Sequence, residues 1–350
     1  MLGNLKVARL AYRLYFGRAG LATRISCVLR LARNRFIGTR APISVMIGVT
    51  YRCQCGCVHC GMESYRVSPE DELSTEEVKG VIRQARDLGA VEITFFGGEP
   101  LLREDLDGVV AYASSIGMLP SLDTNGILLT PGRVDRLITA RLSTVKVSLD
   151  SPDAAVHDRM RGVEGCFESA VAGIRLCIER GLPSVISTYA SRENIRSGDL
   201  QRVIELGRSL GVDALRIIDT TLSGCLLAEK QKQLTGEDRN ILAGLLEPGF
   251  VFLENLASAR ALAHPVCSAV ARRYIYVSPR GDVQPCCFVP LSAGNVREDG
   301  LEDIIARLWK SPVMDYDPGR CLMNNPAFRE RYLPLIESAN SLPRPLMDDR

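Results

Sequence analysis

Apolar and polar positions alternate in blocks through the middle of the chain. Short runs rich in Val, Ile, Leu and Phe predict six β-strands, at about residues 44–49, 91–97, 119–123, 144–149, 184–189 and 213–218. Amphipathic stretches with helical spacing fill the intervals between these runs. This order predicts a parallel sheet whose strands are joined by right-handed helical crossovers. Six units are too few for a closed eight-unit barrel, so the expected fold class is α/β, a partial (β/α)6 TIM-like barrel.

The helix expected before the second strand has a clear start. Ser74 and Glu77 have the spacing of a capping box, in which each side chain accepts a hydrogen bond from the backbone of the other residue. The apolar face of this helix then follows at helical spacing: Val78, Val81, Ile82 and Ala85. Active sites of such barrels lie at the carboxyl ends of the strands, and candidate residues are therefore sought there.

The pattern changes after a stretch that we expect to be a helical connector, at roughly 225–260. Residues 274–277, a turn at 279–282 and the residues from Val283 onward predict a β-hairpin, and a helix is expected at about 301–310. These elements indicate a small α+β domain after the barrel. The expected division is a helical segment at 1–42, the barrel at 43–225, and the connector with the α+β domain at 226–350.

The first 40 residues are basic. They contain nine cations and no Asp or Glu, which leaves 34 of the 43 Lys and Arg against 41 Asp and Glu in the rest of the chain. The cations are Lys6, Arg9, Arg13, Arg18, Arg24, Arg30, Arg33, Arg35 and Arg40. Apolar and aromatic residues between them predict one or two amphipathic helices. Such helices could bind a membrane surface, which would favour a lipid-like or membrane-associated substrate; they could pack on the barrel; or they could bind a leader peptide or nucleic acid.

The overall composition narrows the setting. The net charge of the 350 residues is only +2, so we expect no nucleic-acid partner for the molecule as a whole. No apolar run reaches about 18 residues, and arginines interrupt the apolar stretches near the N-terminus, so neither a spanning helix nor a secretory signal is expected. The predicted location is the cytoplasm, with peripheral attachment to the inner face of the membrane as a further possibility.

Four of the 12 cysteines lie within residues 53–60. In a long chain with no export signal, this clustering favours metal or cluster ligation over disulfides. Cys53, Cys57 and Cys60 supply three thiolates in one loop, whereas Cys55 is off this spacing. A structural zinc site would need four ligands, and no second pair lies nearby. An iron–sulfur cluster held by three cysteines would leave one iron open; the alternative is a structural zinc or redox loop on an ordinary α/β domain.

Cys53-x3-Cys57-x2-Cys60 after a first strand resembles the signature of the radical S-adenosylmethionine (SAM) superfamily. The resemblance extends in order to Gly97-Gly98-Glu99-Pro100, Asp123-Thr124-Asn125-Gly126, Val147-Ser148-Leu149-Asp150 and the segment 156–162. It covers about residues 43–220. These motifs all fall at or after predicted strand ends, where a barrel of this kind would bind its cofactor.

The resemblance implies a role for each matching residue. Cys53, Cys57 and Cys60 would bind a [4Fe–4S] cluster, with SAM on the fourth iron. Gly97, Gly98 and Glu99 would receive the amino group of SAM, and its carboxylate and ribose would contact residues at the next two strand ends: Thr124, Asn125, Ser148 and Asp150. Reductive cleavage of SAM would give a 5′-deoxyadenosyl radical that abstracts a hydrogen atom from the substrate. His59 is expected to pack under the cluster or the adenine.

Cys267-x13-Gly281-x4-Cys286 resembles the opening of a SPASM/twitch extension. This resemblance implies an auxiliary [4Fe–4S] cluster with Cys267, Cys286 and Cys321 as ligands, and Cys287 or an outside group as the fourth. The chain departs from the full SPASM pattern because Asn324 stands where a Cys-x2-Cys pair would continue. The alternative is a cysteine-containing core without iron.

Enzymes with such extensions oxidise or crosslink peptides, dehydrogenate sugars or alcohols, or act on lipids. The auxiliary cluster is thought to accept an electron. Asp282 or Asp219 could serve as general base, but each is expected rather to be a turn or strand-end residue. The expected partners are SAM and a reducing protein such as flavodoxin or ferredoxin. An iron–sulfur electron carrier is the rival, but a carrier has no use for a SAM cradle at Gly97 to Pro100.

Overall fold

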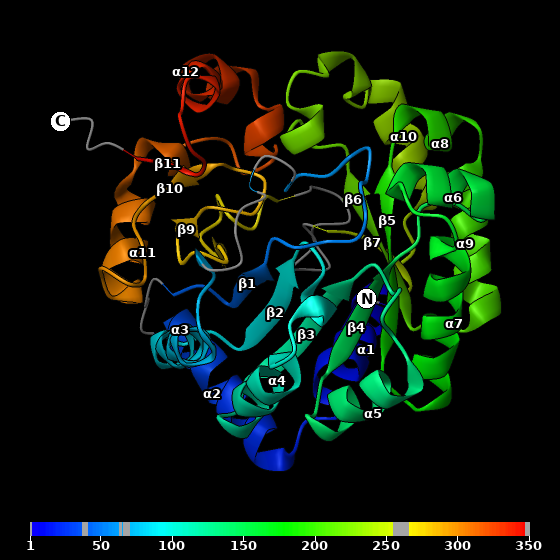
Figure 1. The fold of residues 1–350 in the computed structure, drawn as a ribbon, viewed down its shortest axis with the longest axis horizontal. Coiled ribbons are helices and arrows are strands. Elements are labelled where there is room, and N and C mark those ends of the chain that lie inside the picture. Colours follow the sequence, from blue (N-terminus) through cyan, green and yellow to red (C-terminus); the bar gives the residue numbers. More distant parts are fainter. Residues whose placement is uncertain (1, 37–40, 63–64, 66–70, 255–265, 347–350) are drawn as a thin grey trace.

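A computed structural model describes residues 2–36, 41–62, 65, 71–254 and 266–346 (Figure 1). Its central sheet has nine strands in the order β7-β6-β5-β4-β3-β2-β1-β8-β9, and every neighbouring pair is parallel except β8 and β9. The six predicted strands are confirmed as β1 (Ser44–Thr50), β2 (Glu92–Gly97), β3 (Leu119–Thr124), β4 (Thr144–Ser148), β5 (Ser184–Ala190) and β6 (Ala214–Asp219). The described strands do not close on themselves, so the architecture is the expected open α/β barrel.

Helices cover the outer face of this sheet (Figure 1). They are α3 (Thr75–Leu88), α4 (Leu106–Ser115), α5 (Pro131–Thr139), α6 (Ala154–Arg161), α7 (Cys166–Glu179), α8 (Arg192–Arg196) and α9 (Asp199–Leu210). The predicted capping box begins α3: the Ser74 side chain accepts from the Glu77 backbone N–H, and the Glu77 carboxylate accepts from the Ser74 N–H at 2.7 Å. The predicted apolar face of α3 is buried against the strands.

The connector is only partly helical, contrary to expectation. It contains short 3₁₀ turns and α10 (Gly236–Leu245), but β7 (Val251–Leu253) is a strand that pairs with β6. This strand has only three residues and adds to the sheet next to β6. A run this short has no recognisable periodicity, so the sequence pattern did not predict it. Part of the predicted connector, residues 255–260, lies outside the described residues.

The C-terminal part joins the same sheet. The predicted hairpin is β8 (Tyr274–Val277) and β9 (Val283–Gln284), and β8 pairs in parallel with β1. Helices α11 (Leu301–Lys310) and α12 (Pro326–Glu337) and the short pair β10 (Leu291–Ser292) and β11 (Arg344–Pro345) complete this α+β part. The sheet therefore runs across the expected boundary after residue 225, and the division of the chain into domains stays a prediction.

The basic N-terminal segment forms α1 (Leu2–Ala11), a π-helical turn (Tyr12–Phe16) and α2 (Leu21–Phe36). It packs on the amino ends of the strands: Arg13 pairs with Asp213 at 2.9 Å, and Arg30 donates to the carbonyl of Ala90 at 2.6 Å. Leu14 and Cys27 are buried in this contact. The packing alternative is thus confirmed for the inward side of the segment. No helix among the described residues is long and apolar enough to cross a membrane.

Candidate functional site

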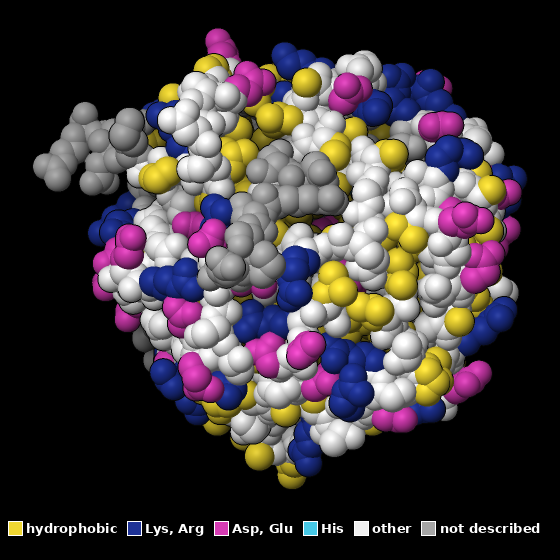
Figure 2. Space-filling view, in the orientation of Figure 1, with side chains coloured by type: hydrophobic (Ala, Val, Ile, Leu, Met, Phe, Trp, Pro, Cys, Tyr) yellow, Lys and Arg dark blue, Asp and Glu magenta, His cyan; other side chains and the backbone are white. Residues whose placement is uncertain are grey.

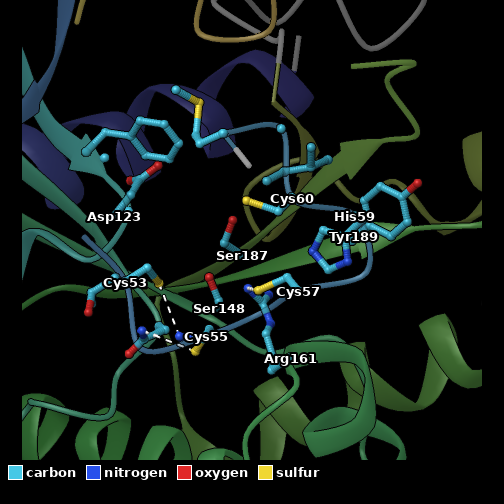
Figure 3. A pocket seen from close by; sticks show the side chains of 18 of the residues that line it. Cys53, Cys55, Cys57, His59, Cys60, Asp123, Ser148, Arg161, Ser187 and Tyr189 are labelled. Carbon is cyan, nitrogen blue, oxygen red and sulfur yellow. Dashed lines mark hydrogen bonds between the residues drawn. The ribbon is translucent and has the colours of Figure 1, made fainter. Parts of the chain in front are cut away.

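A cavity of about 170 Å³ opens at the carboxyl ends of β1 to β6, and we call it the cysteine-loop cavity. Nearly all of the predicted cofactor-binding residues line it: Cys53, Cys57, Cys60, Gly97, Gly98, Thr124, Asn125, Ser148 and Asp150. Figure 3 shows the three cysteines around this cavity, with Arg161 beside Cys57 and His59 stacked on Tyr189. The parallel sheet brings these residues together because each strand ends at the same edge.

Backbone contacts hold the cysteine loop in place. The N–H groups of Gly56 and Val58 donate to the carbonyls of Arg161 and Met160 at 2.9 and 3.0 Å, and the N–H of Cys225 donates to the carbonyl of Cys60 at 2.9 Å. The loop is therefore clamped between the end of α6 and the segment after β6.

Cys55 differs from the other three loop cysteines. Its thiol is buried and accepts a hydrogen bond from the Asn125 amide at 3.4 Å (Figure 3). Contacts with Cys166, Cys53 and Cys57, together with burial, raise the pKa of Cys55. The hydrogen bond with Cys55 and the charge of Arg161 instead lower the pKa of Cys57 to about 6, against the effect of burial. The loop thus favours thiolates at Cys53 and Cys57 and a thiol at Cys55.

Arg161 connects this loop to the end of β4. The sequence placed Arg161 in the segment 156–162 that resembles the superfamily, but it gave no role for this residue. Its guanidinium lies 2.7 Å from the Asp150 carboxylate and 3.7 Å from the sulfur of Cys57. Burial acts to raise the pKa of Asp150, but Arg161, the nearby His59 and His157 and the Tyr189 N–H together outweigh it, and the pKa is lowered. Asp150 also accepts from the Tyr189 N–H at 2.9 Å, so it braces the cavity wall as well as lining it.

His59 is a packing residue, as expected. Its ring stacks on Tyr189 with the centroids 4.4 Å apart and the planes 5° from parallel. Burial lowers the pKa of His59 to about 4, so the ring is neutral near pH 7. Tyr189 and Ser187, at the end of β5, line the cavity but were not among the predicted site residues. Only their position at a strand end could have pointed to them.

Glu99 joins the ends of two strands. Its side chain is fully buried, lies outside the cavity lining and accepts hydrogen bonds from three protein donors. These are the Leu101 N–H at 3.0 Å, the Thr124 hydroxyl at 2.7 Å and the Asn125 N–H at 2.8 Å. Glu99 therefore ties the end of β2 to the end of β3, and its contact with the amino group of SAM stays a prediction.

The close packing of the backbone explains the two glycines before Glu99. A Cβ on Gly97, whose φ is 151°, would lie 2.1 Å from the carbonyl oxygen of Thr50. A Cβ on Gly98 would lie 2.3 Å from the carbonyl oxygen of Arg52. The end of β2 can thus approach the start of the cysteine loop only with glycine at both positions.

A second cavity of about 500 Å³, the C-terminal cavity, contains the other cysteine group. Cys267, Cys286, Cys287 and Cys321 line it. Burial, followed by the charge of Cys286, raises the pKa of Cys267 to about 11 and that of Cys321 to about 12. The three predicted auxiliary ligands therefore lie close enough to influence one another, although 54 residues separate Cys267 from Cys321 in the sequence.

Cys287 is placed differently from these three. It packs in an apolar cluster with Tyr51, Met62 and Tyr276, whereas Cys267, Cys286 and Cys321 border the main core. Asn324 is not available as a ligand, because its side chain accepts from the Leu222 N–H at 3.1 Å and donates to the Thr220 carbonyl at 2.6 Å. It fastens the segment after β6 to the C-terminal part.

The two candidate bases lie in different places. Asp219 lines both cavities, and one of its oxygens pairs with Arg239 at 2.6 Å. Burial raises the pKa of Asp219 against the opposing charge of Arg239. Asp282 lines neither cavity; Ser278 and Asn295 donate to its carboxylate in the β8–β9 turn, at 3.0 and 3.1 Å. The structure therefore supports the turn interpretation for Asp282.

The donor set fits a cluster with one open iron. Cys55 and the three cysteines at the predicted ligand positions line one cavity, and hydroxyl and amide groups from the ends of β3 and β4 line it too. Within the described ranges, no three His, Cys, Asp or Glu side chains converge as the ligands of a single metal ion. Thiolates are the usual ligands of iron–sulfur clusters, and a cluster with three of them keeps a position for an exogenous group.

Comparisons with known proteins agree with this chemistry. Residues 47–203 match the model of the radical SAM superfamily, and residues 267–330 match SPASM, an iron–sulfur cluster-binding domain. The AdoMet-dependent heme synthase of Methanosarcina barkeri is 28% identical over 295 residues, which cover 76% of this chain and 82% of that protein. The PqqA peptide cyclase of Xanthomonas euvesicatoria is 28% identical over 279 residues, covering 75% and 74%.

Two solved structures share the fold. Streptococcus suis SuiB bound to S-adenosylmethionine has a TM-score of 0.62 at 16% identity, covering 81% of this chain and 69% of SuiB. The protein anSMEcpe with AdoMet and a peptide has a TM-score of 0.60 at 17% identity, covering 81% and 84%.

The fold and site define an iron–sulfur enzyme built on an open α/β barrel. The chain belongs to the radical SAM superfamily and carries a SPASM-type C-terminal extension. It is therefore an enzyme that uses a [4Fe–4S] cluster with SAM, and the extension provides for a further iron–sulfur cluster. The zinc-loop and electron-carrier alternatives are set aside on the same evidence.

Proposed function

We propose that the enzyme oxidises its substrate by two electrons in the space between the two cysteine groups. The observation that carries this proposal is the shared wall of the cavities: Ile218, Asp219, Thr221 and Phe288 line both. A substrate that occupies the junction would contact the cysteine-loop cavity on one side and the C-terminal cavity on the other.

When bound, the cluster and SAM supply a 5′-deoxyadenosyl radical that removes one hydrogen atom from a substrate C–H bond, and an auxiliary cluster supplies an acceptor for one electron. The protein must then take the proton that leaves a neighbouring N–H or O–H group of the substrate. Asp219 is placed for this, because its Oδ1 is buried and has no hydrogen-bond partner among the described residues. The substrate thus loses two hydrogen atoms in all, one as a hydrogen atom and one as a proton and an electron.

The substrate class follows from this requirement. It has a C–H bond beside an N–H or O–H group, as in a peptide, an alcohol or a sugar. The sequence similarity to a peptide cyclase supports a peptide as the substrate, whereas the similarity to heme synthases supports a substrate that is not a peptide. A lipid taken directly from a membrane is less favoured, because the basic helices pack on the amino ends of the strands and the cavities open at the carboxyl ends.

The electron that starts the reaction would come from a flavodoxin or ferredoxin in the cytoplasm. Val58 lies between two loop cysteines and is 54% exposed, so this side of the cysteine loop is accessible to a small redox protein.

The test is anaerobic incubation of the reconstituted enzyme with SAM, dithionite and an extract of small molecules and peptides from the source organism. We expect 5′-deoxyadenosine together with a compound that has lost two hydrogen atoms, both detected by mass spectrometry. Changing Cys53, Cys57 and Cys60 to Ala should abolish both products. Loss of carbon dioxide from the substrate, instead of two hydrogen atoms, would contradict the proposed reaction.

Asp219→Asn provides a sharper control. The variant keeps the size of the side chain but cannot take a proton, so 5′-deoxyadenosine should still form while the oxidised product falls about 100-fold or more. Equal product yields from Asp219→Asn and the wild-type enzyme would rule out Asp219 as the base and leave the cleavage of SAM unaffected.

A further inference from the structure

The N-terminal helices carry most of the exposed large hydrophobic side chains among the described residues. Six of the nine large hydrophobic side chains that are exposed in the described ranges belong to residues 2–36: Leu5, Tyr12, Leu21, Ile25, Val28 and Leu29. Their exposed fractions run from 51% to 73%. Such a concentration on two short helices indicates a binding surface, because scattered apolar residues need no explanation but a group of them does.

The four residues on α2 form one face, which we call the outer stripe: Leu21, Ile25, Val28 and Leu29. Their spacing of four, three and one residues places them on the same side of the helix. The opposite side faces the barrel, since Cys27 is buried and the Arg30 guanidinium donates to the carbonyls of Ala90 and Gly117. The outer stripe therefore points away from the protein.

Tyr12, the first residue of the π-helical turn after α1, adjoins this stripe. The Tyr12 hydroxyl accepts from the Arg24 guanidinium at 2.6 Å, and the same guanidinium lies 5.3 Å from the Tyr12 ring centre. Arg24 is one residue from Ile25 on α2, so Tyr12 is held beside the outer stripe. Leu5 lies seven residues before Tyr12, on the same side of its helix.

The N-terminal segment itself carries only positive charge. Residues 2–36 contain no Asp or Glu, and Lys6, Arg9 and Arg13 line a shallow pocket of about 350 Å³ together with Glu247, which pairs with Arg208. Arg13 is paired with Asp213, but Lys6 and Arg9 are exposed. Over the face drawn in Figure 2, by contrast, Lys and Arg are interspersed with Asp and Glu.

We propose that α1 and α2 bind the surface of an anionic lipid bilayer. The outer stripe would enter the boundary between headgroups and acyl chains, and the exposed cations Lys6 and Arg9 would attract the lipid phosphates. A second copy of the chain fits less well, because a two-fold contact through this face would bring like charges together.

The proposal fixes the orientation of the enzyme on the membrane. The helices contact the amino ends of the strands, at Ala90, Gly117 and Asp213, while both cavities lie at the carboxyl ends. An enzyme docked in this way turns its cavities away from the bilayer. Attachment to the membrane is then compatible with a substrate that arrives from the aqueous side. Membrane binding by the N-terminal helices therefore does not require a lipid-like substrate.

The test is flotation of the full-length enzyme with vesicles of phosphatidylcholine alone and of phosphatidylcholine mixed with phosphatidylglycerol. We expect binding to the mixed vesicles only, and weaker binding at high salt. Changing Leu21, Ile25 and Leu29 together to Gln should weaken it at least tenfold. The matched control changes two exposed apolar residues elsewhere, Ile241 and Leu335, to Gln, and should bind like the wild type.

A second variant tests the charges. Each cation near an anionic surface strengthens binding about fivefold, so Lys6→Gln with Arg9→Gln should weaken it about 25-fold. Both variants alter exposed side chains and should keep the SAM-cleavage rate of the wild type. The proposal fails if the wild-type enzyme does not bind mixed vesicles, or if the triple Gln variant binds them equally well. A wild-type dimer that the triple variant converts to a monomer, without vesicle binding, would show instead that a second copy covers the stripe.

Discussion

Glu99 offers the most direct test of how this site is organised. Its carboxylate holds three donors from the ends of β2 and β3, and two of those donors belong to Thr124 and Asn125, which line the cysteine-loop cavity. Glu99→Ala would leave the three buried donors without this acceptor. The change should therefore disturb the protein before any ligand binds.

The size of the effect follows from the hydrogen bonds. Each contributes about 1 kcal/mol net, and an unpaired buried donor costs more than a lost bond, so Glu99→Ala should lower the free energy of unfolding by about 3 kcal/mol. For a chain of this length, this corresponds to a fall in Tm of about 4 °C. Glu99→Gln keeps one acceptor oxygen but turns an amide N–H₂ toward a donor, so we expect about half of this loss.

The pH dependence gives an independent check. Burial raises the pKa of Glu99 to about 7, although the three donors act in the opposite direction. An unfolded glutamate has a pKa of about 4.3. The folded state therefore holds the proton more tightly, and the contribution of Glu99 to stability falls as the pH rises from about 4.3 to about 7. The wild type should exceed Glu99→Gln in stability most at pH 5, and by less at pH 8.

The assay is thermal unfolding of the protein without SAM, followed by measurement of the KM for SAM. A fall in Tm of the SAM-free Glu99→Ala variant, together with weaker SAM binding, is the expected result. The reasoning would be refuted by an unchanged Tm with a raised KM, because that outcome is what a direct contact between Glu99 and SAM would give.

Three further predictions concern the other site residues. In a protein whose Cys53, Cys57 and Cys60 are changed to Ala, the additional change Cys287→Ser should leave the remaining iron in place, whereas Cys321→Ser should remove it. Iron analysis and EPR spectra distinguish the two variants, and equal losses would contradict the placement of Cys287 in an apolar cluster. Arg161→Gln removes a positive charge 3.7 Å from the sulfur of Cys57, so the reduction potential of the cluster should fall in an EPR-monitored titration, and an unchanged potential would argue against this contact. The rate of product formation should fall as the pH is lowered, with a midpoint above the usual aspartate pKa of about 3.9, because burial raises the pKa of Asp219. Asp219→Asn should abolish this acidic limb of the pH profile.

Local features of the sequence were enough to predict most of the fold. The apolar runs gave the six barrel strands in the right order, and the capping box marked the start of α3. The cysteine spacing identified the loop, because ligands of one cluster must lie close together and three of them were within eight residues. Secondary-structure periodicity and ligand spacing are properties of short segments, so they can be read without knowing the packing.

The remaining features depend on residues that are distant in the sequence. The partners of Glu99 at the end of β3 become visible only when two strands are side by side. The junction of the cavities at Asp219 requires the C-terminal part to fold back, with β8 against β1. The exposure of the outer stripe on α2 likewise depends on which face of the helix the barrel covers. Amphipathic periodicity defines the faces of a helix, but only tertiary packing decides which of them is buried and which stays exposed.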